Sequence, residues 1–283
     1  MREVNSSSLF TPTRCNLTRF SGLGIFFIGG ERVKSKKFVC ERDGLKIRGR
    51  VWGSGEGKKP AVLLSHGFLA NERMCFTYAN LLAEMGYIAF TFDFNGGGLF
   101  SRSQGKSEDM TIMTEKADLL AVFKAVRERS DVDREHISLL GCSQGGLVSA
   151  LLAKELNGEV ERLILMYPAL CIPDDARAGS MLFYRFDPEN IPNLLGRFPM
   201  KLGGDYARSV MDMDVYQEIS GFEGKVLYLQ GTADRIVDVS YARRGKDCFL
   251  DCDYREIEGG GHMFSGKHDK IACEILSDFM RRG

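Results

Sequence analysis

The 283-residue sequence has no excess of charge of either sign, because 38 Lys and Arg residues are matched by 38 Asp and Glu residues. A protein that binds nucleic acid through its phosphates normally carries a basic excess. The balance therefore argues against a nucleic-acid partner. Hydrophobic residues make up 44% of the chain and charged residues 27%, which is ordinary for a globular enzyme with one large domain.

The sequence also lacks a long hydrophobic run. The most apolar stretch near its start, residues 24–29 (GIFFIG), is far too short to cross a bilayer. The long apolar core and small-residue cleavage site of a secretory signal are missing too. Residues 1–20 are rich in Ser, Thr, Asn and Arg and show no sustained period. We therefore expect residues 1–36 to form a poorly ordered extension, and we expect no membrane partner.

Clustered metal ligands are missing as well. The eight cysteines are scattered, and the closest pair, Cys248 and Cys252, lies in a charged stretch without nearby histidine ligands. This spacing is weak evidence for zinc, and scattered thiols are typical of a reducing compartment. We expect reduced cysteines, a cytoplasmic location and no bound metal.

From residue 37 onward the sequence alternates regularly between apolar strands and amphipathic helices. Asp43-Gly44 is a turn dipeptide that predicts a hairpin between residues 37–42 and 45–52. Residues 71–85 place apolar side chains at i, i+3, i+4 and i+7, as a helix requires. Alternation of this kind predicts a mostly parallel sheet with helices on both faces. Further strands are expected at 60–65, 88–94, 136–142, 160–167, 225–230 and 253–258, and further helices at 111–129, 144–156, 239–249 and 267–281.

The alternation breaks between residues 170 and 221. This segment holds four of the seven prolines and several aromatic residues without a clean period. A long irregular segment inside a compact domain is typically a functional lid or an inserted subdomain. We therefore predict one α/β domain, residues 37–283, with a lid insertion at 170–221.

The segment Gly141–Gly145 (GCSQG) lies where a predicted strand meets a predicted helix. A nucleophile on such a turn has a strained backbone, and glycines two residues away on each side avoid clashes. A turn centred on Cys142 would need glycines where Leu140 and Gln144 stand. The glycine phase therefore favours Ser143 as the nucleophile and Cys142 as a small packing residue.

Four histidines are available as the base that a serine nucleophile needs. His66 follows a strand directly and is better placed to shape an oxyanion loop, whereas His136 opens a strand at the opposite edge of the sheet. His262 follows three glycines after the last strand, at the carboxyl edge where Ser143 lies. We predict His262 as the base, with His268 at the start of the last helix as the alternative.

The acid that orients the base should come between serine and histidine in chain order. Asp234 lies just past the strand at 225–230, again at the carboxyl edge, and could hold the imidazole tautomer. Asp238 is the competitor, although its place before a predicted helix suits a cap. We predict Asp234.

An oxyanion hole needs two backbone N–H donors. The N–H of Gln144 follows the nucleophile at a helix N-terminus, and Phe68 follows the strand at 60–65. We predict these two residues as the donors. The Phe68 ring could also pack beneath the lid, and both roles are compatible.

With these residues placed, the chain from about residue 37 resembles the α/β-hydrolase superfamily, and more narrowly the bacterial cinnamoyl and feruloyl esterases. The resemblance depends on four segments, which read HGF at 66–68, FDFNG at 92–96, SQGG at 143–146 and LGGDY at 202–206. It implies hydrolysis of hydroxycinnamic esters and a phenolic pocket formed largely by the insertion. It also implies that Asp174 or Asp175 and Tyr206 meet a ring hydroxyl.

Two positions depart from that family's pattern. The family usually has a histidine where this chain has Gly97, and another where it has Cys142. Neither position belongs to the predicted triad, so the departures bear on the substrate and not on hydrolysis.

These observations predict a serine carboxylic-ester hydrolase of the α/β-hydrolase fold, acting on a small-molecule ester through an acyl-enzyme. No cofactor is expected, because the triad supplies nucleophile, base and charge stabilisation. Two alternatives stay open. One is a peptidase or lipid acyl hydrolase with the same triad, and the other is a non-catalytic binding protein of the same fold.

Overall fold

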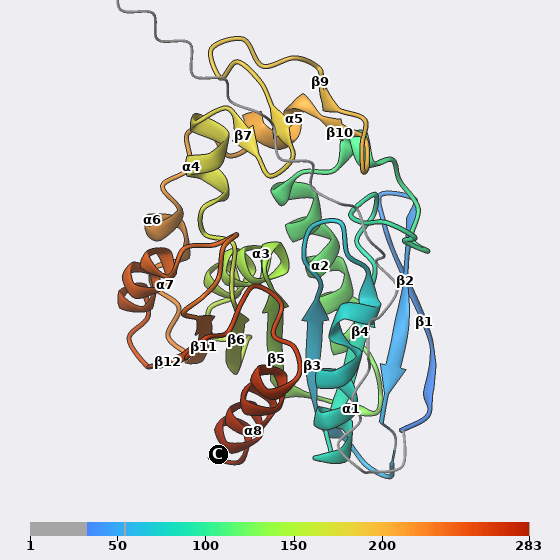
Figure 1. The fold of residues 1–283 in the computed structure, drawn as a ribbon. Helices are drawn as coiled ribbons and strands as arrows, with labels where there is room; N and C mark the ends of the chain where they lie inside the picture. Colours follow the sequence, from blue (N-terminus) through green and yellow to red (C-terminus); the bar gives the residue numbers. More distant parts are fainter. Residues whose placement is uncertain (1–32, 54, 283) are drawn as a thin grey trace, which may run out of the picture.

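The computed structural model describes residues 33–53 and 55–282 (Figure 1). Residues 1–32, most of the predicted N-terminal extension, lie outside this part of the chain. The first strand, β1 (Ser35–Arg42), begins two residues before the predicted start of the domain. It pairs with β2 (Leu45–Trp52) in the predicted hairpin, in which Asp43 and Gly44 both have positive φ. Such φ values are those of a tight hairpin turn.

The described residues form one eight-stranded sheet in the order β1-β2-β4-β3-β5-β6-β11-β12. β2 runs antiparallel to both of its neighbours, and the six strands from β4 to β12 are parallel. Every residue of β4 and β6 is buried, which is typical of central parallel strands covered on both faces. The parallel strands are β3 (Lys59–Ser65), β4 (Ile88–Phe92), β5 (Val132–Cys142), β6 (Arg162–Met166), β11 (Lys225–Gly231) and β12 (Cys252–Ile257).

Helices cover both faces of this sheet, as predicted. Two separate hydrophobic cores form, one on each face. The smaller core packs α1 (Phe76–Glu84) and α8 (Lys267–Arg281) against the strands. The larger core lies beneath α2 (Ile112–Arg127), α3 (Gln144–Glu155) and α7 (Val239–Gly245). The short 3-10 helices are η1 (Glu72–Cys75), η2 (Ser107–Asp109) and η3 (Lys246–Cys248).

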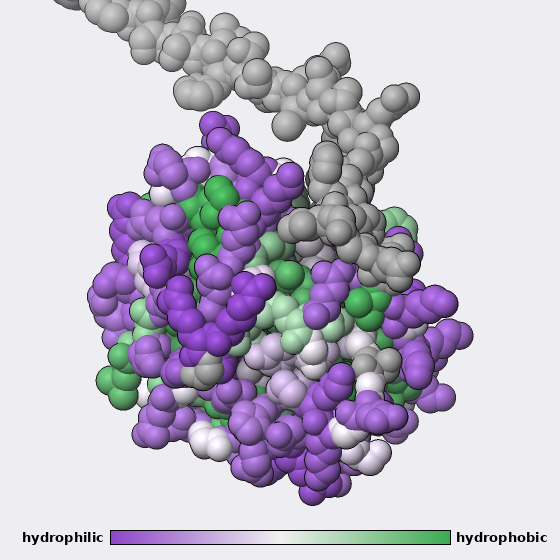
Figure 2. Space-filling model, turned by 90° about the horizontal axis from the view of Figure 1, so that it is seen from below, coloured by the Kyte–Doolittle hydropathy of each residue, from purple (hydrophilic) through white to green (hydrophobic). Residues whose placement is uncertain are grey.

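Between β6 and β11 the chain forms the predicted insertion from short elements, most of them stacked beyond one end of the sheet (Figure 1). Its hydrophobic residues join the larger core. Seen from the opposite end, the molecule presents mainly hydrophilic residues with hydrophobic ones between them (Figure 2). The short elements are α4 (Ile172–Arg177), β7 (Ser180–Met181), β8 (Tyr184–Arg185), β9 (Leu194–Gly196), β10 (Leu202–Gly203), α5 (Gly204–Arg208) and α6 (Val215–Ile219).

The described residues bear on two of the expectations, which concern the cysteines and membrane-spanning helices. Their cysteines are all free, namely Cys40, Cys75, Cys142, Cys171, Cys248, Cys252 and Cys273. Within the same part of the chain, every helix is too short or too polar to traverse a lipid bilayer.

Candidate active site

Ser143 lies on the sharp turn between β5 and α3. Its backbone is strained, with φ 53° and ψ −120°, and only 8% of the residue is exposed. A Cβ on Gly141 would lie 2.2 Å from the Gly145 carbonyl oxygen, and one on Gly145 would lie 2.5 Å from the carbonyls of Ser65 and His66. Both glycines are therefore needed for the turn to pass this close to its neighbours.

The structure brings Ser143, His262 and Asp234 into one hydrogen-bonded chain. His262 Nε2 lies 2.9 Å from Ser143 Oγ, and His262 Nδ1 lies 2.8 Å from Asp234 Oδ2. The three residues follow β5, β12 and β11, so the carboxyl edge of the sheet assembles them. The arrangement lets the imidazole take a proton from Oγ while the carboxylate holds the tautomer.

Asp234 is held as a carboxylate. Its Oδ1 accepts hydrogen bonds from the backbone N–H groups of Ile236 and Val237, and its Oδ2 accepts one from the Gln230 side chain at 2.9 Å. Burial raises the pKa of Asp234, but the bonds from His262 and the two N–H groups outweigh it and lower the pKa below its ordinary value. The charge is therefore available to stabilise an imidazolium at His262.

The two alternatives for these roles lie elsewhere. The Asp238 carboxylate accepts a hydrogen bond from Ser240 N at 2.9 Å and caps α7. His268 lies in the first turn of α8, and its Nε2 is buried with no hydrogen-bond partner among the described residues. The side-chain hydrogen bond of Ser143 Oγ is made by His262 and by neither of these residues.

The segment from His66 to Asn71 lies directly against the serine. A Cβ on Gly67 would come within 3.0 Å of Ser143 Cβ and 3.5 Å of Ser143 Oγ. His66 fixes this segment from below, because its Nε2 accepts the Phe94 N–H at 3.2 Å and its Nδ1 donates to the Gly67 carbonyl at 2.8 Å. Burial lowers the pKa of His66, so the ring stays neutral and serves as a brace.

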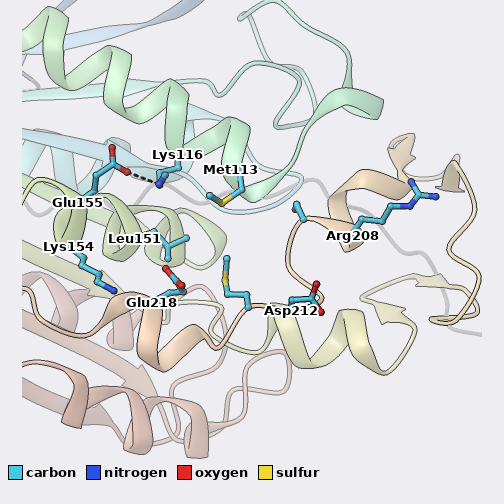
Figure 3. A pocket seen from close by; sticks show the side chains of 10 residues that line it. Met113, Lys116, Leu151, Lys154, Glu155, Arg208, Asp212 and Glu218 are labelled. Atoms are coloured by element: carbon cyan, nitrogen blue, oxygen red, sulfur yellow. Dashed lines mark hydrogen bonds and ion pairs between the residues drawn. The ribbon is translucent and has the colours of Figure 1, made fainter.

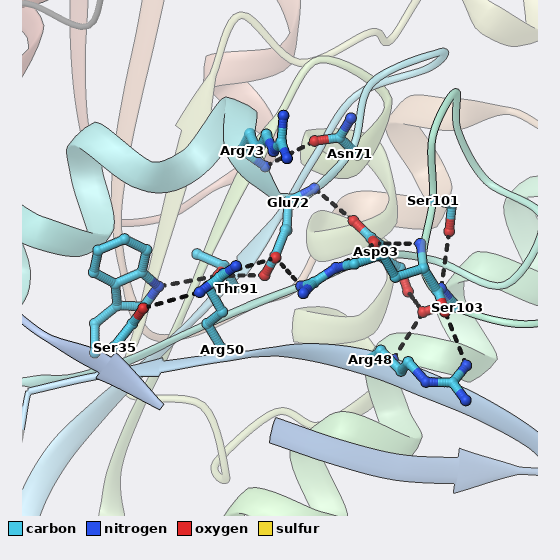
Figure 4. Close-up of polar contacts among 12 residues, drawn as sticks. Ser35, Arg48, Arg50, Asn71, Glu72, Arg73, Thr91, Asp93, Ser101 and Ser103 are labelled. Atoms are coloured by element: carbon cyan, nitrogen blue, oxygen red, sulfur yellow. Dashed lines mark hydrogen bonds and ion pairs between the residues drawn. The ribbon is translucent and has the colours of Figure 1, made fainter. Parts of the chain in front are cut away.

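A polar cluster holds the same segment against the glycine-rich loop that follows β4 (Figure 4). The buried Asp93 carboxylate accepts the Glu72 N–H and the Arg102 N–H, both at 2.7 Å. Asn71 Nδ2 donates to the Leu99 carbonyl at 3.0 Å. These bonds cross from one loop to the other, so the backbone that carries Phe68 has a fixed position. This cluster was not among the predicted site residues.

Phe68 packs beneath the insertion, as the second reading of this residue expected. Its ring centroid lies 5.6 Å from that of Tyr206 and 6.4 Å from that of Tyr184. Both tyrosines are buried residues of the insertion. The aromatic contact links the loop beside Ser143 to the predicted lid.

Gln144 forms a second buried hydrogen-bond chain, on the other side of the turn. Tyr206 donates its hydroxyl to Gln144 Oε1, and Gln144 Nε2 donates to Glu115 Oε2 at 2.7 Å. Glu115 is fully buried on α2, and burial raises its pKa well above the ordinary value. Sequence reasoning missed Glu115, although it lies four residues before Leu119, on the apolar face predicted for this helix.

The predicted substrate-contacting residues have different surroundings. Asp174 is exposed on α4 and accepts hydrogen bonds from Arg177 at 2.6 Å and Tyr241 at 2.8 Å. Asp175 is half-buried, and burial raises its pKa. The Tyr206 hydroxyl is engaged by Gln144. The Asp175 carboxyl interacts with the Cys171 thiol and with the charge of Arg185, and it makes no ion pair as close as that of Asp174 with Arg177.

A cavity of about 500 Å³ lies apart from the serine, between α2, α3 and the segment that joins α5 to α6 (Figure 3). Charged side chains dominate its wall, and an ion pair between Lys116 and Glu155 crosses it. None of its lining residues belongs to the Ser143 chain or to the loop at 66–71. Within the described residues, no group of three or more His, Cys, Asp or Glu side chains is placed to hold a metal ion.

The sheet order, the strained serine turn and the loops at the carboxyl edge define an α/β-hydrolase. Residues 56–202, slightly more than half of the chain, match the serine aminopeptidase S33 family (Hydrolase_4). The chain therefore belongs to this hydrolase family.

Solved and curated proteins agree with this assignment. Est1E from Butyrivibrio proteoclasticus, solved with bound ferulic acid, is similar over 86% of this chain and 97% of its own, with 29% identity and a TM-score of 0.79. The alpha/beta hydrolase domain-containing protein 17C of Xenopus tropicalis is 27% identical over 208 residues, covering 73% of this chain and 57% of that protein.

The thiohydrolase aneE of Aspergillus aculeatus is 30% identical over 146 residues, half of this chain and 43% of its own length. The chain spans between about a third and three fifths of the curated relatives it matches. The predicted α/β-hydrolase fold is confirmed. The predicted resemblance to feruloyl esterases is confirmed too, by the similarity to Est1E, which was solved with ferulic acid.

Proposed function

We propose that the protein is a serine carboxylic-ester hydrolase in which Ser143, His262 and Asp234 form the catalytic triad. The observation that carries this proposal is the pair of hydrogen bonds of 2.9 Å and 2.8 Å that link the three side chains. Ser143 Oγ attacks the ester carbonyl carbon while His262 Nε2 takes its proton. The imidazolium formed in this step faces the ionised Asp234.

The tetrahedral intermediate places its negative oxygen toward the backbone N–H groups of Phe68 and Gln144. The Gln144 N–H lies at the N-terminus of α3, where the helix dipole also favours negative charge. His262 then returns the proton to the leaving alcohol, and the acyl group stays on Ser143. A water molecule, deprotonated by His262, hydrolyses the acyl-enzyme by the same steps in reverse order.

The acyl group is proposed to be a hydroxycinnamoyl group or another small acyl group. The likeness to Est1E with ferulic acid supports this class, as does the aromatic cluster of Phe68, Tyr184 and Tyr206 beside the serine. Of the two aspartates of α4, Asp175 is the better candidate to accept a ring hydroxyl, because the Asp174 carboxylate already accepts hydrogen bonds from Arg177 and Tyr241. A cytoplasmic location, expected from the cysteine usage, stays a prediction.

Replacing Ser143 by Ala tests the triad. We expect turnover of a chromogenic aryl ester to fall by about 10⁴-fold or more, because Ser143 is the hydroxyl that His262 Nε2 binds in the described part of the chain. The purified variant should keep the circular-dichroism spectrum of the wild type. Retained turnover would show that another residue is the nucleophile.

A peptidase is the second candidate, since the family to which the chain belongs is named after a serine aminopeptidase. A panel of methyl hydroxycinnamates, aryl acetates and aminoacyl amides separates the two functions by their kcat/KM values. The proposal expects hydroxycinnamates to be the best substrates, and a preference for aminoacyl amides would overturn it. A fluorophosphonate probe that fails to label Ser143 would instead favour a non-catalytic binding protein.

A further inference from the structure

A chain of buried polar groups joins the insertion to helix α2 through the residue next to the nucleophile. The Tyr206 hydroxyl and the Glu115 carboxyl bind opposite ends of the Gln144 side-chain amide. Their exposed fractions are 2% for Tyr206, 1% for Gln144 and 0% for Glu115. Water cannot replace either bond, so the Gln144 side chain has one set of partners and one orientation.

The direction of each bond follows from the chemistry of the groups. Burial raises the pKa of Tyr206 well above its ordinary value, so its hydroxyl remains a donor and the Gln144 oxygen accepts. The Gln144 NH₂ group therefore faces Glu115, and the Asp118 carboxyl lies one turn further along α2. Glu115 Oε1 has no partner among the described residues and faces the backbone of Gly97. A neutral carboxyl fits this site.

Tyr206 also contacts the second residue of the proposed oxyanion hole. Its ring lies 5.6 Å from the ring of Phe68, while its hydroxyl binds the side chain of Gln144. One residue of α5 thus touches both residues whose N–H groups are proposed to hold the oxyanion. Glu115 fixes the far end of the same chain from α2.

We propose that Glu115 and Tyr206 are positioning residues, which aim the Gln144 N–H at the oxyanion and transmit the placement of the insertion to the catalytic turn. This inference rests on the proposed function, because it assigns the Gln144 amide its catalytic role. Its consequence is that contacts between an acyl group and the insertion affect kcat as well as binding. A donor displaced by a fraction of an ångström stabilises the transition state less, although the substrate still binds.

The test compares the variants Glu115→Leu and Glu115→Gln. Leucine fills a similar volume but cannot accept the Gln144 NH₂ group, whereas glutamine can accept it and stays neutral. For Glu115→Leu we expect kcat for a chromogenic aryl ester to fall about tenfold with KM within about twofold. This is less than the 10²–10³ typical of losing an oxyanion donor outright. For Glu115→Gln we expect kcat within about twofold of the wild type.

Ser149→Ala is the matched control. Ser149 lies on α3, as Gln144 does, and is a fully buried polar residue whose hydroxyl has no partner among the described residues. Its removal should leave kcat unchanged. If Glu115→Leu turns over ester at the wild-type rate, or if Ser149→Ala loses as much activity, the positioning role is wrong.

Tyr206→Phe tests the other end of the hydrogen-bond chain, at the Gln144 oxygen. It also replaces Glu115→Leu as the test if that variant does not fold. We expect about a threefold loss of kcat, equal for hydroxylated and plain cinnamates, and no further loss when it is combined with Glu115→Leu. A loss confined to hydroxylated substrates would instead place the Tyr206 hydroxyl on the substrate ring and overturn the inference.

The labelling rate with a fluorophosphonate separates this inference from the proposed function. The reagent phosphonylates the serine of an active triad whatever the natural substrate is, and fluoride leaves. A wild-type protein that is not labelled contradicts the proposed function and the inference together. A wild-type protein that is labelled no faster than Glu115→Leu contradicts the inference alone.

Discussion

Two hydrogen-bond chains leave the same turn from neighbouring residues, and each ends on a carboxyl group. From Ser143 the chain runs through His262 to Asp234, and from Gln144 it runs to Glu115. Asp234 accepts bonds from an imidazole, a side-chain amide and two backbone N–H groups, and its pKa is lowered. Glu115 accepts a bond from one amide, and its pKa is raised.

The contrast indicates that donors, not burial alone, decide the direction in which the pKa of each of these two carboxyl groups shifts. Burial raises the pKa of both groups, and only at Asp234 do enough donors converge to reverse the effect. The group with the lowered pKa binds the His262 imidazole, and the group with the raised pKa binds the Gln144 side-chain amide. The following experiments test that division.

Replacing each of the two carboxyl groups by the matching amide should lower activity greatly at Asp234 and hardly at all at Glu115. Asp234→Asn should lower kcat/KM for an aryl ester about 10³–10⁴-fold, because an amide can donate to His262 Nδ1 and hold the wrong tautomer. Glu115→Gln should stay within about twofold of the wild type. Steady-state kinetics of both variants under one condition provides the comparison, and similar losses in the two would remove the distinction.

Crowding the Glu115 carboxyl should destabilise the fold. A Cβ on Gly97 would lie 2.7 Å from Glu115 Oε1 and 2.5 Å from Phe94 Cβ, so Gly97→Ala should lower the free energy of unfolding by about 1–3 kcal/mol. Urea unfolding measures the change. Gly261→Ala is the control, since a Cβ there approaches only the Ala233 carbonyl at 4.0 Å. An unchanged urea midpoint for Gly97→Ala would mean that the loop after β4 shifts to admit the methyl group without lowering the free energy of unfolding.

The opposite pKa shifts predict different dependences of stability on pH. The folded pKa of Glu115 lies above its ordinary 4.5, so the folded state retains a proton that the unfolded state has lost. Stability from this group is present below pH 4.5 and is lost as pH rises toward the folded pKa, by up to about 1.4 kcal/mol per pH unit. The folded pKa of Asp234 lies below 3.8, so its contribution is lost only as pH falls through that lower value.

Unfolding in urea between about pH 5 and pH 8, measured for the wild type and for Glu115→Gln, reports on Glu115 because the two proteins share every other titrating group. Glu115→Gln cannot ionise, so its free energy of unfolding should rise relative to the wild type as pH increases. A difference between the two proteins that stays constant over this range would show that the folded protein accommodates the Glu115 charge.

The smallest effect is expected for an ion pair in water. Arg127 on α2 pairs with Glu159, and both side chains are more than a third exposed. Arg127→Ala should change the free energy of unfolding by less than about 1 kcal/mol, because solvent screens the pair. Thermal unfolding at low and high salt checks this. A loss as large as that of Gly97→Ala would mean that the surface pair matters as much as the buried chain.

Local patterns predicted the regular elements well. Residues 267–281 form α8 with the predicted bounds, because apolar residues at helical spacing leave little choice there. The strand β5 begins at Val132, four residues before the predicted start at His136. The earlier start was missed because residues 133–136 are polar and largely exposed, and they show no alternation typical of a strand. The predicted helix at 71–85 divides into the 3-10 helix η1 and the α-helix α1. The Asn71 side chain accepts a hydrogen bond from the Arg73 N–H and caps the start of η1.

The hydrogen-bonded serine, histidine and aspartate could be inferred from one sequence because each follows a strand end, and parallel strands bring their ends together. The insertion could be delimited but not resolved, since strands of two residues have no period to detect. The Gln144 chain was missed for a different reason. A glutamate on an apolar helix face indicates burial, but its partners come from α3 and α5, and no local pattern connects these segments.

Ser143 and His262 stand 119 residues apart in the chain, and β11 and β12 join the edge of the sheet last in sequence. A ribosome that adds about 5–20 residues per second needs on the order of 6–24 s to pass from one to the other. For most of that interval the nascent chain carries the serine turn but neither Asp234 nor His262, and Asp234 is added before His262. The order of the strands therefore delays assembly of the hydrogen-bonded chain of Ser143, His262 and Asp234 until the final edge of the sheet has folded.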